Sequence, residues 1–264
     1  MKTPRYMSGK SIDAVGIIPA RWGSSRFPGK PLAMIGDRTM IERVWRRAMK
    51  ALSRVIIATD DTRIAGEARR FGAEAVMTSP DCPNGTARVL EAYLKAGHGE
   101  EIVVDIQGDE PFVDPEVITG TAGLLAGQHS IGIATSATLY SGDYDGLADP
   151  NRVKVTVDRL GRAMTFSRSV IPYIRDAGHE KWPQLYPYLI HTGLYAFRAD
   201  RLAGLVEMPP SPLEQCERLE QMRWLGNGEE ILVHISRGEH LPSVDTPADI
   251  DKAVAALGSV GEID

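Results

Sequence analysis

The sequence is poor in the features that mark several classes of protein. Its 264 residues include two cysteines, Cys82 and Cys216, which exclude a disulfide framework and a cysteine-rich zinc site. No apolar run approaches the roughly 18 residues that a membrane helix needs, and the N-terminal segment lacks the apolar centre of a signal peptide. We therefore expect a reduced, cytoplasmic protein that does not enter a membrane.

The chain also lacks an excess of positive charge. Its formal net charge of −5 argues against a general nucleic-acid-binding protein and leaves room for a local basic pocket. The six histidines show no paired metal-ligand spacing, so we expect no zinc site. With 43% apolar and 25% charged residues, the composition predicts a globular protein with a substantial core.

In the first half of the chain, strand patterns alternate with helix patterns. Apolar runs at 14–18, 54–59, 101–106 and 131–135 alternate with helix-like segments at 40–51, 62–71, 86–96 and 115–127. This order predicts an α/β protein with a Rossmann-like, mostly parallel sheet that is flanked by helices. Open sheets of this kind bind ligands at the loops after their strands. The loops after Pro19, Thr59 and Ile106 are therefore the first candidates for a site.

The pattern changes after residue 142. Residues 152–166 indicate two strands around a turn at Leu160 and Gly161, and the proline- and aromatic-rich stretch 171–189 indicates a long irregular insertion. We interpret about 138–200 as a smaller lobe inserted into a single domain that spans 1–264. Helices near 212–226 and 247–257, with a strand at 231–236 between them, then return the chain to the main body.

A loop rich in glycine and cations follows the first predicted strand. The stretch GIIPARWGSSRFPGKPL (16–32) carries Arg21, Arg26 and Lys30 among glycines and serines. Glycines let the backbone approach a ligand, and backbone N–H groups together with Arg and Lys bind phosphate. The glycine spacing differs from that of a Walker loop, Pro31 stands where that loop has a hydroxyl residue, and no G-x-G-x-x-G follows the strand. The loop is predicted to bind a polyphosphate of another kind.

The further motifs of the chain, in their order, resemble those of a known family. After the phosphate loop come NGTARVLEA (84–92), DIQGDEP (105–111), NRVKVTVD (151–158), FSRSVIPY (166–173), HTGLYAFR (191–198), SPLEQCERLEQMR (211–223) and PSVDTPADI (242–250). This ordered set covers nearly the whole chain and is similar to the sugar-activating nucleotidyltransferases, and within them to the synthetases of CMP-3-deoxy-manno-octulosonate (CMP-Kdo).

The resemblance implies a fold, a reaction and an assembly. The fold is that of nucleotide-diphospho-sugar transferases, with a smaller inserted lobe for dimerisation and sugar binding, and the assembly is a homodimer. In the reaction, the 2-hydroxyl of Kdo attacks the α-phosphate of CTP and releases pyrophosphate, with Mg²⁺ as cofactor. The product, CMP-Kdo, serves lipopolysaccharide assembly.

The resemblance also assigns roles to individual residues. The catalytic residues are Arg21, Lys30, Asp109 and Asp245, of which the two aspartates match the metal ligands. The nucleotide-binding residues are Pro19, Ala20, Arg21, Ser24, Ser25, Lys30, Gly85, Arg88 and Gln107, with Arg26 as a weaker candidate. The sugar-binding residues are Gln107, Arg168, His191, Tyr195, Glu220 and Gln221.

The chemistry of these residue types suits their roles, although several have an ordinary alternative. Cations of the phosphate loop offset charge on a leaving pyrophosphate, and Mg²⁺ binds through one or two carboxylates plus substrate phosphates. Taken alone, Asp109 indicates a turn and Asp245 a helix N-cap, but their two motifs together favour the metal site. Taken alone, His191 indicates a structural histidine and Arg88 an exposed helix residue.

Two motifs depart from the family pattern. Ile190 and Thr192 flank the matching histidine where the family has a basic and a small aliphatic residue, while NGTAR has Asn84 for serine and Ala87 for an acid. The acceptor therefore stays open between Kdo, an 8-amino-Kdo, another ulosonic acid and a carboxylated phosphonate. Two further alternatives are an enzyme that transfers a uridylyl or guanylyl group to a sugar phosphate and a non-catalytic nucleotide-binding regulator. The sugar-acid motifs argue against the former, and the paired aspartates argue against the latter.

Overall fold

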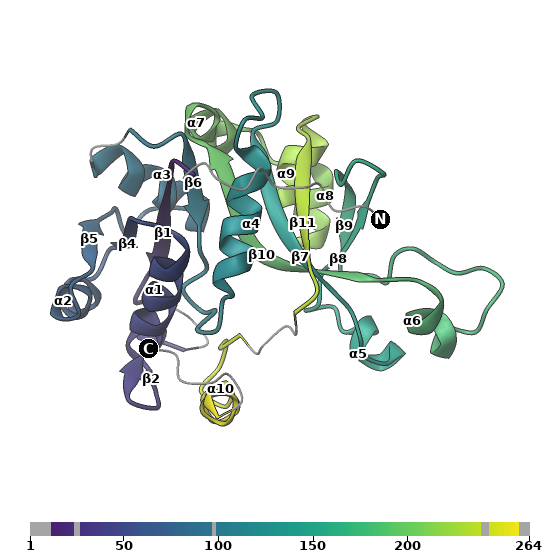
Figure 1. Ribbon diagram of the computed structural model, residues 1–264, viewed down its shortest axis with the longest axis horizontal. Coiled ribbons are helices and arrows are strands. Elements are labelled where there is room, and N and C mark those ends of the chain that lie inside the picture. The colour runs from purple at the N-terminus through teal and green to yellow at the C-terminus, as the bar shows by residue number, and fades with distance from the viewer. Residues whose placement is uncertain (1–11, 24–26, 97–98, 239–242, 259–264) are drawn as a thin grey trace.

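One mixed sheet organises the molecule. The computed structural model describes residues 12–23, 27–96, 99–238 and 243–258, and within them nine strands form this sheet (Figure 1). In spatial order its strands are β11 (Ile231–Ser236), β7 (Ile133–Leu139), β10 (Leu189–Arg198), β6 (Ile102–Asp105), β1 (Ala14–Ala20), β4 (Val55–Thr59) and β5 (Glu74–Met77), with β8 (Lys154–Val157) beside β10 and β9 (Ala163–Ser167) beside β8.

Strand directions confirm the predicted mostly parallel α/β sheet. Strands β6, β1, β4 and β5 run parallel, and β11 runs parallel to β7. Two strands are exceptions: β10 pairs antiparallel with β6, β7 and β8, and β9 pairs antiparallel with β8. Because β1 and β6 are parallel neighbours, the loops that follow them leave the same edge of the sheet.

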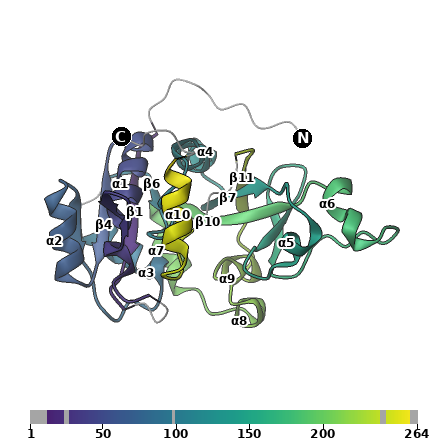
Figure 2. The same ribbon diagram turned by 90° about the horizontal axis from the view of Figure 1, so that it is seen from below.

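The helices cover both faces of the sheet, as the alternation along β1 requires. Val15 and Ile17 face one side, and Ala14, Ile18 and Ala20 face the other. Apolar residues of α1 (Met40–Ala51), α2 (Thr62–Arg70) and α4 (Pro115–Leu125) pack on the Ile18 side; those of α3 (Gly85–Lys95), α7 (Ala199–Glu207) and α9 (Gln221–Gly226) pack on the Ile17 side. Figure 2 shows α1 and α4 above the sheet and α7 and α9 below it.

Side-chain caps explain where three of these helices begin. Asp61 accepts a hydrogen bond from Arg63 N at the start of α2, and Asp114 accepts one from Glu116 N at the start of α4, where Pro115 occupies the first helical position. Asn84 caps α3 by accepting from Ala87 N. The helices predicted at 40–51, 62–71, 86–96 and 115–127 are confirmed, with ends that differ by at most two residues.

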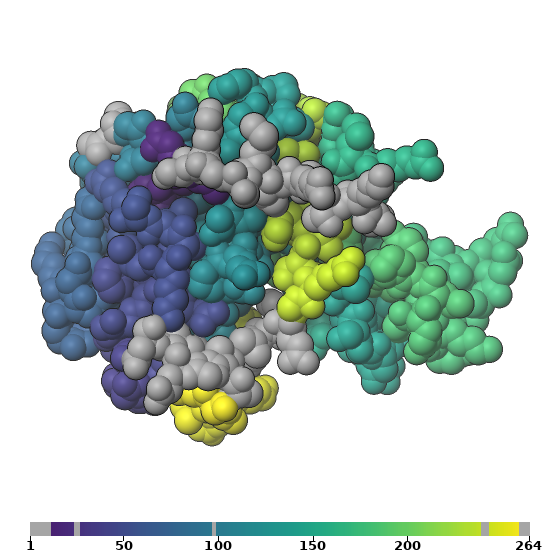
Figure 3. Space-filling view, viewed as in Figure 1, coloured from purple at the N-terminus to yellow at the C-terminus, as the bar shows by residue number. Residues whose placement is uncertain are grey.

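The residues between β7 and β10 form a lobe that stands out from the body of the molecule (Figure 3). It contains α5 (Tyr144–Ala148), a 3-10 turn η2 (His179–Lys181), α6 (Trp182–Leu185) and the β8–β9 hairpin. The two predicted strands around Leu160 and Gly161 are confirmed as this antiparallel hairpin. Leu147, Trp182 and Tyr188 pack with Ile190 in a small core of the lobe.

The lobe ends earlier in the chain than the predicted boundary near residue 200. Residues 189–198 form β10, a central strand of the main sheet, and 199–207 form α7 on its face. Strand β10 escaped sequence analysis because Gly193 and a break in its register interrupt the apolar pattern.

The predicted helix at 212–226 is two helices. Helix α8 (Pro212–Glu217) ends at Arg218, which adopts the left-handed conformation, and α9 begins at Gln221. The predicted helix at 247–257 is confirmed as α10 (Asp249–Leu257). No helix among the residues that the structure describes combines the length and apolarity of a membrane span.

Helix α10 is tied to the beginning of the chain. Ala253 of α10 and Val244, which precedes it, pack with Ile35 and Met40 around Phe112. Ile35 belongs to the short hairpin of β2 (Met34–Ile35) and β3 (Arg38–Thr39), which follows the 3-10 turn η1 (Lys30–Leu32). This packing brings the segment around Asp245 next to the phosphate loop.

The strained backbone at Arg218 generates a stability prediction. With φ 54° and ψ 46°, this residue adopts a conformation that costs an L-residue roughly 1–2 kcal/mol and costs glycine little. We expect Arg218→Gly to have a free energy of unfolding about 1 kcal/mol higher than Arg218→Ala, the control that also removes the side chain but keeps Cβ. Urea unfolding measures both, and equal values for the two variants would contradict the assignment of strain.

Candidate active site

Three charged side chains from distant parts of the chain meet at one edge of the sheet. Lys30 Nζ donates a hydrogen bond of 2.8 Å to Asp109 Oδ2 and lies 3.6 Å from Asp245 Oδ1. The side chains of Lys30, Asp109 and Asp245 are 15%, 32% and 43% exposed, so the group borders solvent. Three of the four predicted catalytic residues are thus in contact.

The fold holds this group from both ends of the chain. Lys30 opens η1 after β1, and Asp109 lies in the loop after the neighbouring β6. Val244 closes the arrangement, because its N–H donates to Asp109 O at 3.0 Å and its carbonyl accepts from Lys30 Nζ at 3.0 Å. Helix α10 begins after Ala248 without a side-chain cap, so Asp245 does not act as its N-cap.

A third carboxyl group adds to the electrostatics of the site. Burial raises the pKa of Glu110 to about 8, and Asp109 and Asp245 raise it further in the same direction while Lys30 opposes them. Two carboxylates therefore converge on one point, and a third carboxyl group nearby is kept from ionising. Hard oxygen donors with this charge balance fit a divalent cation such as Mg²⁺, which Asp109 and Asp245 would hold.

The phosphate loop is closed by an aromatic contact. Gly29 has φ 73° at the start of η1, and its N–H donates to Trp22 O at 3.1 Å. The Trp22 ring lies directly over Gly29, and the guanidinium of Arg63 from α2 lies 3.3 Å from the centre of that ring. Trp22 therefore links α2 to the loop that carries Lys30.

The remaining predicted residues of this loop divide into two groups. Arg21 follows β1 and is exposed. Ser24, Ser25 and Arg26 lie outside the described residues, so the structure does not place them.

The end of β1 meets the start of α3. A Cβ on Gly85 would contact Pro19 Cγ at 3.6 Å, and a Cβ on Gly108 would come within 2.9 Å of Pro19 O. The backbone of Gly108 therefore approaches that of Pro19 closely, and Gly85 lies against the Pro19 ring, with Ala20 next along β1. The predicted nucleotide-binding residues Pro19 and Ala20 thus lie at the N-terminus of α3, which begins with Gly85, and the first N–H groups of a helix suit an anion or a base.

Arg88 is buried, unlike the exposed helix residue that its position alone indicates. Its side chain is 4% exposed, and its guanidinium donates to the Thr78 hydroxyl and, at 2.9 Å, to Asp60 Oδ2. Arg88 thus ties α3 to the segments that follow β4 and β5. Both of its terminal nitrogens are engaged within the protein.

Four of the predicted sugar-binding residues belong to one partly buried polar cluster: Gln107, Tyr195, Glu220 and Gln221. Asn84 Nδ2 and Thr86 Oγ1 donate to the Glu220 carboxylate at 2.6 and 2.8 Å. Tyr195 donates its hydroxyl proton to Gln221 Oε1 at 3.0 Å, and both residues are buried. Asn84, one of the departures from the family pattern, therefore both caps α3 and holds Glu220.

Asp105 completes this cluster from the end of β6. It is buried, lies opposite Tyr195 in the β6–β10 pairing, and accepts a hydrogen bond of 3.2 Å from Gln107 Nε2. Burial raises its pKa well above the ordinary range, and the charges of Glu220 and Asp109 raise it further. Burial likewise raises the pKa of Glu220. The cluster is held by hydrogen bonds and resists the gain of further negative charge.

Sequence analysis did not single out Asp105 and Glu110. Both lie inside the DIQGDEP motif, and Asp105 ends a strand whose other residues are apolar. A carboxylate at the end of a buried strand was the signal that could have identified Asp105. Glu110 had no signal of its own beside Asp109.

Arg168 lies outside this cluster, at the corner between β9 and α8. Its Nε donates to Glu217 O at 2.7 Å and its Nη1 to Pro150 O at 2.9 Å. Glu217 in turn accepts hydrogen bonds from Ser167 Oγ and Arg168 N. The buried Lys154 supports the corner by donating to Arg168 O. Arg168 is therefore held by backbone carbonyls, with its outer edge partly exposed.

His191 contributes from β10. Its Nε2 lies 2.8 Å from the Thr135 hydroxyl, and its ring packs edge-on against Phe166. Burial lowers the pKa of His191 to about 3. The imidazole is therefore neutral at physiological pH.

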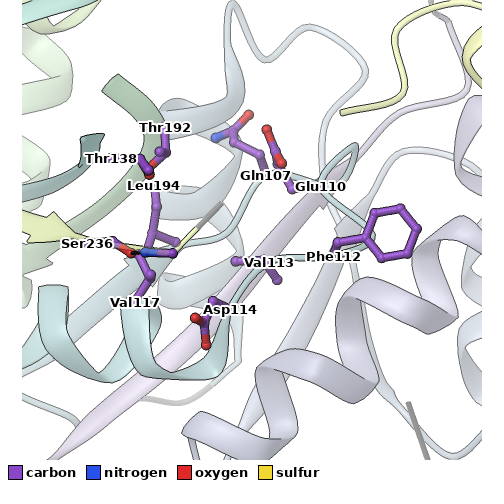
Figure 4. Close-up of a pocket in the computed structure, with 11 residues that line it drawn as sticks. Gln107, Glu110, Phe112, Val113, Asp114, Val117, Thr138, Thr192, Leu194 and Ser236 are labelled. Atoms are coloured by element: carbon purple, nitrogen blue, oxygen red, sulfur yellow. Dashed lines mark hydrogen bonds between the residues drawn. The ribbon is translucent and has the colours of Figure 1, made fainter. Parts of the chain in front are cut away.

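A cavity lies between the loop after β6 and the neighbouring strands (Figure 4). Its polar side chains, apart from Asp114, come from two places: Gln107 and Glu110 of the loop, and Thr138, Thr192 and Ser236 of β7, β10 and β11. Figure 4 shows these two groups on opposite sides of the cavity. Because Asp109 lies between Gln107 and Glu110 in the chain, this space lies beside the charged group.

Comparison with known proteins shows the family to which this chain belongs. The family described as "Cytidylyltransferase" matches residues 15–231. The chain therefore belongs to the cytidylyltransferase family, a class of nucleotidyltransferases, and the family predicted from the motifs is confirmed.

Individual relatives carry more specific names than the family does. The 3-deoxy-manno-octulosonate cytidylyltransferase of Porphyromonas gingivalis is 44% identical over 253 residues, which cover 95% of this chain and 99% of that protein. The mitochondrial enzyme of the same name from Arabidopsis thaliana is 44% identical over 240 residues, 90% of this chain and 81% of that protein. A solved structure of CMP:2-keto-3-deoxy-manno-octonic acid synthetase complexed with CTP is 37% identical, with a TM-score of 0.85 over 93% of this chain and 98% of that one.

The contact between Trp22 and Gly29 generates a prediction for the phosphate loop. In Gly29→Ala, the positive φ is strained and the new Cβ would come within 2.8 Å of a Trp22 ring carbon. We expect the free energy of unfolding to fall by roughly 1–2 kcal/mol, with a change in tryptophan fluorescence as the ring is displaced.

The matched control for this variant is Gly23→Ala, whose Cβ would meet no atom within 4 Å. We expect Gly23→Ala to change the free energy of unfolding by less than about 0.5 kcal/mol. Urea unfolding followed by fluorescence compares the two, and equal losses in both variants would contradict the proposed contact.

Proposed function

We propose that this chain is a Mg²⁺-dependent cytidylyltransferase that joins CTP to 3-deoxy-D-manno-octulosonate (Kdo), giving CMP-Kdo and pyrophosphate. The observation that carries the proposal is the contact of Lys30 with Asp109 and Asp245 at the sheet edge. A cation beside paired carboxylates is the arrangement that phosphoryl transfer needs, because charge stabilisation and positioning supply most of its catalysis. The names of the relatives supply the base and the acceptor.

In this reaction the protein binds and aligns the reactants. Lys30 and the exposed Arg21 would hold the triphosphate and offset the charge that gathers on the leaving pyrophosphate. The 2-hydroxyl oxygen of the sugar forms a bond to the α-phosphorus, the bond from that phosphorus to the pyrophosphate oxygen breaks, and the hydroxyl proton passes to solvent. Mg²⁺, held by Asp109 and Asp245, would neutralise phosphate charge and favour ionisation of the hydroxyl.

The nucleotide site would read cytosine with backbone groups. Pro19 and Ala20 end β1, and Gly85 at the start of α3 packs against the Pro19 ring. Backbone donors and acceptors held at such a contact distinguish the amine of cytosine from the carbonyl of uracil. Arg88 holds α3 in place through its bonds to Thr78 and Asp60.

The polar cluster and the cavity would receive the sugar acid. Gln107, Tyr195, Glu220 and Gln221 offer hydrogen-bonding groups for hydroxyls, and the exposed edge of Arg168 offers positive charge for a carboxylate. Thr192 stands at the cavity wall, where its hydroxyl bonds to Ser136. An 8-amino-Kdo, another ulosonic acid and a carboxylated phosphonate are the alternative acceptors, and a non-catalytic nucleotide-binding regulator is the less favoured reading.

We further propose a cytoplasmic homodimer that serves lipopolysaccharide assembly, with CTP and the sugar acid as its partners and no role for nucleic acid or a membrane. The lobe supports the dimer, because it exposes apolar side chains around a shallow hollow lined by Tyr140 and Tyr186. Three large apolar side chains in or near this hollow are exposed to solvent: Leu139 (40%), Leu185 (58%) and Tyr173 (73%). Apolar and aromatic side chains of this kind are enriched at the centres of interfaces.

Release of pyrophosphate tests the function. Purified protein is incubated with each of CTP, UTP, ATP and GTP, paired with Kdo, 8-amino-Kdo, other ulosonic acids or a carboxylated phosphonate, with and without Mg²⁺. We expect release with CTP and Kdo that requires Mg²⁺. Release with CTP and another acid alone would transfer the proposal to that acceptor, and the lack of release with every pair would favour the regulator.

Removal of one carboxylate at a time tests the assigned metal ligands. We expect Asp109→Asn and Asp245→Asn each to lower kcat by about 100-fold or more, because each variant loses a charged ligand and weakens charge stabilisation of the transition state.

Asp251→Asn is the control for these two variants, since Asp251 is exposed in the first turn of α10. We expect it to keep the activity of the unmodified protein at every Mg²⁺ concentration. Pyrophosphate release across an Mg²⁺ titration gives the comparison, and full activity of either asparagine variant at saturating Mg²⁺ would show that its carboxylate is not a ligand.

A further inference from the structure

A bulge in β10 sets the position of His191. In the pairing with β7, His191 lies opposite Ala137 and Tyr195 lies opposite Thr135, so three residues of β10 oppose Ser136 alone. Gly193, within these three, has φ 72°. Bulges beside ligand sites change the direction in which side chains point and leave backbone groups out of the regular ladder.

The hydroxyl of Thr135 forms a hydrogen bond with a backbone carbonyl of the bulge. Thr135 is fully buried, and its Oγ1 donates to Leu194 O at 2.7 Å. The same oxygen lies 2.8 Å from His191 Nε2. A hydroxyl has one proton, and that proton is engaged with the carbonyl of Leu194. His191 Nε2 must therefore be the donor in its contact with Thr135.

The other ring nitrogen is fixed by this assignment. Burial lowers the pKa of His191 to about 3, so the ring is neutral and carries one N–H. With the proton on Nε2, Nδ1 carries a lone pair and accepts hydrogen bonds. Phe166 and Tyr195 hold the ring at centroid distances of 5.1 and 5.4 Å, which limits its rotation.

We propose that Thr135 is a positioning residue that fixes His191 as the Nε2–H tautomer and leaves Nδ1 as an acceptor for the sugar acid. The inference rests on the proposed function in one respect, since the acceptor site is taken to include His191. In this state His191 offers the substrate no donor, so it recognises a hydroxyl or ammonium group and does not hold the carboxylate. The carboxylate must find its donors elsewhere in the site.

The tautomer is measured directly by nuclear magnetic resonance. Protein labelled with ¹⁵N in its histidine rings gives a two-bond ¹H–¹⁵N correlation spectrum in which a protonated and an unprotonated ring nitrogen are clearly separated. Loss of one pattern in His191→Gln assigns His191. We expect Nε2 protonated and Nδ1 unprotonated at neutral pH, and a shift towards the Nδ1–H form in Thr135→Val. A wild-type ring protonated on Nδ1, or on both nitrogens, would overturn the proposal.

Kinetics test the consequence for the substrate. We expect Thr135→Val to raise the KM for the sugar acid about tenfold, the effect of one lost hydrogen bond, with the KM for CTP unchanged. Thr135→Ser, which keeps the hydroxyl, should restore both the tautomer and the KM. An unchanged KM in Thr135→Val, or a failure of Thr135→Ser to restore it, would overturn the positioning role.

A matched control separates this effect from a general loss of packing. Thr121 on α4 is also fully buried and donates its hydroxyl proton to Val117 O at 2.7 Å. Thr121→Val makes the same isosteric change at a second buried site, and we expect it to leave the His191 tautomer and both KM values unchanged. If the wild type released no pyrophosphate with any pair, the proposed function would fail, while the spectrum would still decide the tautomer.

Discussion

The position of one ammonium group between two carboxylates is the constraint on which the rest of the structure depends. Lys30 reaches Asp109 and Asp245 because β1 and β6 are parallel neighbours whose following loops share one edge of the sheet. The contact with Asp245 also requires the last described helix to pack against the start of the chain, which the apolar cluster around Phe112 achieves. The ion pairs of Lys30 therefore join segments that are far apart in the sequence. The exposed parts of the three side chains leave them open to charged ligands.

The site combines two polar environments that differ in charge. Around Lys30, burial and then the charges of Asp109 and Asp245 raise the pKa of Glu110, and the two aspartates beside the ammonium group suit a cation and phosphates. Around His191 and Tyr195, uncharged side chains form hydrogen bonds with Thr135 and Gln221, and such groups suit hydroxyls. The cavity of Figure 4 lies between the loop of the first environment and strands of the second. Charged and uncharged groups of the reactants would thus be accommodated side by side at one edge of the sheet.

Sequence patterns predicted the parts of this protein that local rules govern. The strands at 14–18 and 54–59 are continuous apolar runs, and the helix starts at Thr62 and Gly85 follow capping residues, so their types and limits were readable. Features that depend on tertiary contacts were missed: β10 because a bulge breaks its pattern, and the helix break at Arg218 because no glycine marks it. Motifs predicted Lys30, Asp109 and Asp245 as site residues, and the structure brings these three together, whereas the burial of Arg88 depends on partners that follow other strands.

The most direct test of the central claim is to detect the metal and the nucleotide at this point together. Mn²⁺ is added in place of Mg²⁺ to protein saturated with CTP, and electron paramagnetic resonance measures the free Mn²⁺. If Asp109 and Asp245 form the metal site beside Lys30, the wild type binds Mn²⁺, and Asp109→Asn and Asp245→Asn each weaken that binding about tenfold or more. Equal Mn²⁺ binding by the wild type and both variants would show that the metal site lies elsewhere and that the meeting of these three side chains is structural.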